Sequence, residues 1–108
     1  MTNSDTDLRF RVLLSVQRAL IGEITPSMRF VSVEYSVDRI HIIVWHDGAM
    51  SDSDREDFDA CAVTDVAADF WPPDGDPTPS VDFVRCDYPM RPDFRGTIVY
   101  GRKEESVA

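Results

Sequence analysis

Apolar residues near the start of the chain recur at close to the helical period. They lie at Phe10, Leu13, Val16 and Leu20. This spacing predicts an amphipathic helix over residues 6–22. Gly22 allows the helix to stop there, and Pro26 prevents it from continuing.

Two segments with strand spacing follow the first helix. Val31, Val33 and Tyr35 alternate with other residues in the segment 30–35, which predicts a half-buried strand. Residues 39–45 are rich in β-branched and aromatic side chains, which favour a second strand. Because only a short turn separates the two, we expect them to form a hairpin.

A second apolar stripe of helical period predicts a helix over residues 52–70. Its members are Phe58, Ala62, Val66 and Phe70. Cys61 falls beside this stripe and is expected to be buried. The run Trp71-Pro72-Pro73 ends the helix, and residues 72–79 are expected to form a rigid loop.

The second half of the chain completes an α-β-β-α-β-β order with strands at 81–88 and 96–100. This order predicts an α+β fold: a two-layer sandwich in which a four-stranded sheet carries two helices on one face. We expect one domain over residues 1–108, with frayed ends at 1–6 and 103–108. Strand order stays open. A right-handed crossover would make the second and third strands parallel neighbours, and the hairpins could also meet by other edges.

The core of this small chain is expected to include Trp45, which lies within the second strand. Phe30 alternates away from the apolar side chains of its own strand. We therefore expect it to leave an apolar spot on the uncovered face of the sheet, which would indicate a second contact or a dimer.

Charge is distributed unevenly along the 108 residues, of which 43% are hydrophobic and which carry a net charge of −9. Residues 47–76 hold ten acids and one base, whereas the segments before and after them are balanced. A surplus of this sign argues against nucleic acids and anionic membranes as partners and favours a partner with a basic surface.

The acidic surplus follows the second predicted helix and its flanking turns. Asp52 and Asp54 are explained by the helix dipole alone, which stabilises acids in a first turn. Glu56 repels its helical neighbours, and Asp69 faces the unfavourable end of the dipole, so we favour a docking surface over a merely solvated face. Trp71 adds a candidate aromatic anchor. The predicted partner-binding residues are Asp52, Asp54, Glu56, Asp57, Asp59, Asp69, Trp71, Asp74 and Asp76.

No motif in the chain indicates a metal, a cofactor or a catalytic site. The alternating acids from Asp52 onward resemble a calcium loop, but they lack its glycine at the sixth position and its glutamate at the twelfth. Neither Cys61 nor Cys86 has an evident basic neighbour. We expect no enzyme. A small enzyme whose site is built from His46 and Asp47 is the least favoured of three hypotheses.

The ends and hydropathy of the chain predict a cytoplasmic protein. No apolar run approaches the roughly 18 residues of a membrane span. The first seven residues are polar and acidic, unlike a signal peptide. A homo-oligomer is compatible with the sequence but is not indicated by it.

Three stretches of the chain resemble a known group of proteins. They are Leu13–Pro26 with the strand after it, Arg85–Pro89 and Val99–Glu104. Together they are similar to small bacterial immunity proteins of the colicin-like and contact-dependent-inhibition type, over about residues 8–104. The resemblance implies a protein that binds and blocks the toxin domain of a neighbouring gene, and it supplies no catalytic residues.

Two functions from different classes follow. The first is an immunity protein that neutralises a cognate toxin, with a basic nuclease as the expected toxin because a nuclease needs a basic groove. The alternative is a non-enzymatic acidic adaptor module without a toxin partner. A toxin-like reading frame beside the gene would favour the first.

Overall fold

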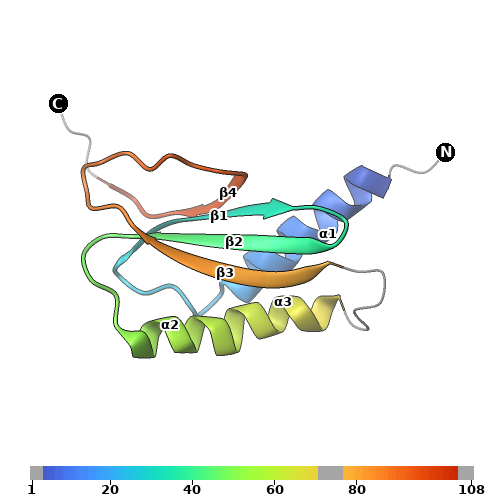
Figure 1. Cartoon of the computed structure of the whole chain (residues 1–108), viewed down its shortest axis with the longest axis horizontal. Coiled ribbons are helices and arrows are strands. Elements are labelled where there is room, and N and C mark those ends of the chain that lie inside the picture. Colours follow the sequence, from blue (N-terminus) through green and yellow to red (C-terminus); the bar gives the residue numbers. More distant parts are fainter. Residues whose placement is uncertain (1–3, 71–76, 105–108) are drawn as a thin grey trace.

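A four-stranded mixed sheet forms one layer of the molecule, and two helical segments cover one of its faces (Figure 1). The computed structural model describes residues 4–70 and 77–104. The predicted α+β class and the predicted element order are confirmed. The elements are α1 (Ser4–Ala19), β1 (Met28–Tyr35), β2 (Arg39–His46), α2 (Asp52–Phe58), η1 (Asp59–Val63), α3 (Thr64–Asp69), β3 (Thr78–Arg85) and β4 (Thr97–Gly101).

The strands lie in the order β3-β2-β1-β4. β1 pairs with both β2 and β4 in antiparallel fashion, so the expected hairpin is present. β2 and β3 are parallel, because the chain crosses through the second helical segment between them. This is the crossover arrangement that the sequence left as one of several alternatives.

The main core fills the space between the helices and one face of the sheet. Val31 pairs with Val44 and Val33 with Ile42 across β1 and β2, so their side chains share this face. Val12 and Val16 of α1 are fully buried against them. Phe10, which the apolar stripe placed inward, is 59% exposed, since the buried face of α1 is centred on Val12, Val16 and Ala19.

The second helical segment is one continuous helix from Asp52 to Asp69, close to its predicted range, with a π-helical turn at η1. The wider turn buries both Ala62 and Val63 and leaves Cys61 exposed, so the expectation of a buried Cys61 is wrong. The carboxylate of Glu23, followed by desolvation and the nearby carboxylates of Asp57 and Asp65, raises the pKa of the Cys61 thiol. A raised pKa disfavours the thiolate, which is the nucleophilic form of cysteine.

β3 begins at Thr78, three residues before its predicted start. Pro79 belongs to the segment 72–79, for which the sequence predicts a rigid loop. As β3 is an edge strand, this position requires no donor on the open side, and proline is tolerated there.

A small second layer covers part of the other sheet face. Trp45 is buried as expected, but on the face opposite the helices, where its Nε1 donates to Ser32 Oγ at 3.1 Å. Phe94, from the connection between β3 and β4, packs edge-on against Phe30 at 4.8 Å and Trp45 at 5.8 Å between ring centroids. Phe30 is therefore half-buried rather than an open apolar spot. At Gly96, which ends this connection, φ is +76° and an added Cβ would lie 2.1 Å from the Val33 carbonyl oxygen.

Candidate interaction surfaces

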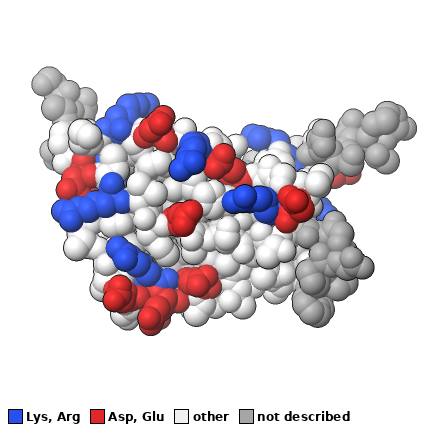
Figure 2. Space-filling model, in the orientation of Figure 1, with Lys and Arg blue, Asp and Glu red and all other residues white. Residues whose placement is uncertain are grey.

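Five of the predicted partner-binding acids lie together at the start of the second helical segment. We call them the acidic row: Asp52, Asp54, Glu56, Asp57 and Asp59. In Figure 2 acidic side chains gather at the end of the molecule where α2 begins. All are exposed except the half-buried Asp54. Ser51 caps the helix by accepting a hydrogen bond from the Asp54 amide at 3.1 Å, which fixes where the row begins.

Most of the acidic row has no internal counter-ion. Asp52 lies 3.9 Å from Arg55, a distant pair in water. Across residues 4–70 and 77–104, no ion pair engages Glu56, Asp57 or Asp59. These three carboxylates repel one another and are free to meet an external cation.

Asp69 has an internal role that the sequence did not reveal. Its carboxylate accepts a hydrogen bond from Ser15 Oγ at 2.6 Å and forms an ion pair with Arg18 of α1. These contacts join the end of α3 to α1 and compensate the unfavourable position of Asp69 at the helix C-terminus. Its part in binding a partner stays a prediction.

The remaining predicted binding residues, Trp71, Asp74 and Asp76, lie outside the described residues. Their proposed roles stay predictions.

A second charged region lies at the end of the sheet and is paired throughout. Arg29 is only 2% exposed, and Glu104 binds it through both carboxylate oxygens, at 2.6 Å and 3.0 Å. Arg29 also donates to the carbonyl oxygens of Cys86 at 2.6 Å and Met90 at 2.7 Å. Glu104 was expected to belong to a frayed tail, but this contact holds it.

Arg102 extends the same cluster. It donates to Glu104 at 3.2 Å, to Asp47 at 2.9 Å and to the carbonyl oxygen of Pro26 at 2.9 Å. The hydrogen bonds from Arg29, together with the charges of both arginines, hold the pKa of Glu104 below its ordinary value despite partial burial. We call Arg29, Asp47, Arg102 and Glu104 the paired cluster.

The neighbouring turn is fixed by Asp87. Its carboxylate accepts hydrogen bonds from Arg85 at 3.0 Å and from the Gly48 amide at 2.7 Å, and these lower its pKa. This region therefore ties the end of β2 to the end of β3.

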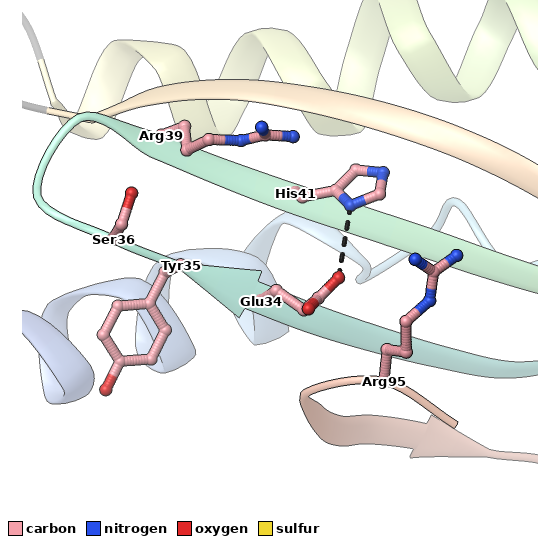
Figure 3. A pocket seen from close by; sticks show the side chains of 6 residues that line it. All are labelled: Glu34, Tyr35, Ser36, Arg39, His41 and Arg95. Atoms are coloured by element: carbon pink, nitrogen blue, oxygen red, sulfur yellow. Dashed lines mark ion pairs between the residues drawn. The ribbon is translucent and has the colours of Figure 1, made fainter. Parts of the chain in front are cut away.

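His41 lies in the uncovered half of the open sheet face, between two carboxylates. Its Nε2 is 2.7 Å from Asp82, and its Nδ1 is 3.4 Å from Glu34. Figure 3 shows Arg39 and Arg95 on either side of it, around a hollow of about 390 Å³. Because two arginines balance two carboxylates here, this hollow attracts a basic partner less than the acidic row does.

The proposed pair of His46 and Asp47 does not form. His46 is buried, and its Nδ1 bonds the Gly48 carbonyl oxygen at 2.8 Å. Asp47 instead binds Arg102 in the paired cluster. Cys86 also differs from expectation, since it follows β3 and its Sγ lies 3.8 Å from Arg29.

An apolar patch on the outer side of α1 escaped the sequence analysis. Phe10 and Leu14, one helical turn apart, are 59% and 65% exposed. Centring the helical wheel on Val12, Val16 and Ala19 would have placed both on the outer side.

Two features are absent from the part of the chain that the structure describes, residues 4–70 and 77–104. None of the helices in these residues is long and apolar enough to cross a membrane. These residues also contain no group of three or more His, Cys, Asp or Glu side chains placed to hold a metal ion.

Comparison with known proteins gives one match over most of the chain. The model of a family described as "MafI2 immunity protein" matches residues 9–104. No curated protein matches the chain. The match agrees with the resemblance to bacterial immunity proteins, and the colicin-like or contact-dependent type stays a prediction.

Proposed function

Since this chain belongs to the MafI2 immunity protein family, we propose that it neutralises a cognate toxin in the cytoplasm by binding it through the acidic row. The family implies the toxin partner. The basic character of that partner and the surface that meets it are our proposal.

The free carboxylates of the acidic row support this choice of surface. Glu56, Asp57 and Asp59 are exposed and have no ion pair with a described residue, so an approaching cation meets their full charge. By contrast, each carboxylate of the paired cluster is already bound to an arginine. A basic toxin therefore gains most by docking over α2.

A nuclease is the toxin class that this surface fits best. A nuclease must present a basic groove to its polyanionic substrate. An acidic row can cover that groove, and complementary charge raises association rates by roughly ten- to a thousandfold at low salt. Rapid capture suits a protein that must block a toxin before it acts. Trp71 stays a predicted aromatic anchor.

The test uses the toxin domain encoded beside this gene, purified and assayed for nuclease activity. We expect the chain to inhibit it at a one-to-one ratio and to restore growth when the two are co-expressed. Replacing Glu56, Asp57 and Asp59 together by lysine should slow association about tenfold or more at low salt and flatten its salt dependence.

A matched control reverses three exposed acids elsewhere. Asp7, Asp38 and Asp93 replaced by lysine change the net charge by the same amount but leave the acidic row intact. Equal slowing in both triple variants would show that net charge matters and that the row does not. Binding without loss of toxin activity would favour the adaptor interpretation.

A further inference from the structure

β3 presents backbone hydrogen-bonding groups that have no partner in the described structure. It is the edge of the sheet, with β2 on one side only. The Thr78 amide donates to Asp38 at 3.3 Å, and the Cys86 amide donates to His46 at 2.8 Å. Between them the register with β2 is continuous. Because backbone groups alternate in direction along a strand, the even-numbered amides face β2 and those of Val81, Phe83 and Arg85 face outward.

The two edges of the sheet differ in how well they are protected. β4 is five residues long, and its register with β1 is interrupted between Val31 and Ser32. Short, irregular edges of this kind discourage further pairing. β3 is eight residues long with no register shift. Pro79 near its start and the exposed charges of Asp82 and Arg85 act against pairing, but these charged side chains point to the sheet faces and leave the outward backbone groups open. β3 is therefore the edge more suited to accept another strand.

The surroundings of β3 leave room for such a segment. A hollow of about 380 Å³ lies between the start of β3 and the second helical segment, where the helix presents small or apolar side chains. It is lined by Ala60, Val63, Ala67 and Pro79, with Glu56 and Asp59 contributing carboxylates. Figure 2 shows little charge over α3, beside the acidic side chains over α2. Val81 and Phe83 are only half-buried.

From these features we infer that β3 receives an extended segment of the toxin as a fifth strand, and that this segment carries lysine or arginine side chains that face Glu56 and Asp59. The inference rests on the proposed function and adds a binding mode to it. Main-chain hydrogen bonds to Val81, Phe83 and Arg85 supply affinity, and the carboxylates select a basic segment.

A second copy of this chain is a poorer occupant of the same edge. Pairing two β3 strands would bring two acidic rows into one assembly. Each chain also carries a net charge of −9. Repulsion therefore favours a basic toxin over self-association.

Amide hydrogen exchange on the unmodified protein tests the inference directly. The probe is the toxin domain encoded beside this gene, carrying an inactivating substitution. In the free chain the amides of Val81, Phe83 and Arg85 should exchange rapidly, while those of the even-numbered β3 residues are slow. In the complex we expect exchange at these three outward amides to slow by about a hundredfold.

A pair of variants isolates the backbone donor. Val81→Pro removes an amide that makes no bond in the free chain, whereas Val81→Ala keeps the amide and shortens the same side chain. We expect Val81→Pro to weaken toxin binding about a hundredfold and Val81→Ala to bind nearly as the unmodified chain does. Circular dichroism checks that each variant is folded. If Val81→Pro does not fold, hydrogen exchange on the unmodified protein decides whether a strand is added to β3.

The outcomes separate the two proposals. A complex in which the outward amides exchange as fast as in the free chain would overturn strand addition and leave the proposed function standing. Failure of the unmodified chain to bind or inhibit the toxin would overturn the proposed function itself. Concentration-dependent protection of these amides in the free chain would assign the edge to a second copy and overturn the inference.

Discussion

The acidic row and the paired cluster contain the same kinds of side chain in opposite circumstances. In the paired cluster, Glu104 and Asp47 are bound by buried or half-buried arginines at 2.6–3.2 Å. In the acidic row, the one ion pair among the described residues joins Asp52 to Arg55 at 3.9 Å. The first region joins the strand ends and the C-terminal segment, whereas the second adds little to the fold.

The difference shows which charges in this small protein are available to a partner. A buried charge with its hydrogen bonds satisfied supports the fold, and removing one member leaves the other desolvated. An exposed, unpaired charge costs little to keep and little to remove, so its effect appears mainly in association. Substitutions in the paired cluster should therefore lower the free energy of unfolding, whereas substitutions in the acidic row should mainly change toxin binding.

The largest effect should follow the loss of Arg29. Arg29→Met removes the buried donor of two carbonyl oxygens and leaves Glu104 with Arg102 alone, and we expect the free energy of unfolding to fall by about 3–5 kcal/mol. Urea denaturation measures this loss. Arg91→Met is the matched control, because Arg91 is exposed and no hydrogen bond or ion pair engages it in the described residues. Equal losses in both variants would show that the cluster has no special role.

Loss of the Glu104 charge should lower the free energy of unfolding by a smaller amount, and this loss should depend on pH. Its pKa is lower in the folded chain than in the unfolded chain, because Arg29 binds the carboxylate. The resulting stabilisation is fully present above the unfolded pKa of about 4.3 and is lost as the pH falls through the folded pKa. At neutral pH we expect Glu104→Gln to cost about 1.5–3 kcal/mol, as for a hydrogen bond to a charged group.

The measurement is the free energy of unfolding from pH 7 to pH 3 for both proteins. The difference between them should shrink toward the acidic end. A difference that stays constant over this range would contradict the assignment, because it would mean that ionisation of Glu104 does not contribute.

Much of the fold was predictable because local pattern and tertiary packing agree. Alternation predicted the first strand of the hairpin, β-branched and aromatic content predicted the second, and the second helix was placed within one residue at its end. The errors occur where a non-local feature intervenes. A π turn rotates Cys61 outward, and an open sheet edge accommodates Pro79 within a strand.

The candidate surfaces were less predictable than the fold, because pairing between distant residues leaves no local pattern. Asp69 and Arg18 are 51 positions apart, and Arg29 and Glu104 are 75 apart. Counting charges in sequence blocks located the acidic surplus but could not separate bound from free carboxylates. The free edge of β3 also depends on strand order, which the sequence left open.

Loss of the Asp69 carboxylate should lower the free energy of unfolding by an intermediate amount, unlike loss of carboxylates from the acidic row. Asp69→Asn removes the ion pair with Arg18 and weakens the hydrogen bond from Ser15. As the site is partly exposed, we expect a loss of about 0.5–1 kcal/mol in the free energy of unfolding. Thermal unfolding of Asp69→Asn and of Arg18→Met measures it, and the double variant should lose less than the sum of the two. Additive losses would contradict a direct interaction.

The smallest effect on stability should come from the acidic row itself. Glu56→Gln, Asp57→Asn and Asp59→Asn together remove mutual repulsion and break no described ion pair, so we expect the free energy of unfolding to stay equal or to rise by a few tenths of a kcal/mol. Asp69→Asn is the control from the same helical segment, since it also neutralises an acid but breaks a pair. Urea denaturation at low and moderate salt measures both, and any gain in the triple variant should shrink as salt screens the repulsion. A loss of 1 kcal/mol or more in the triple variant would give these carboxylates a structural role and remove the main reason to regard them as free for a partner.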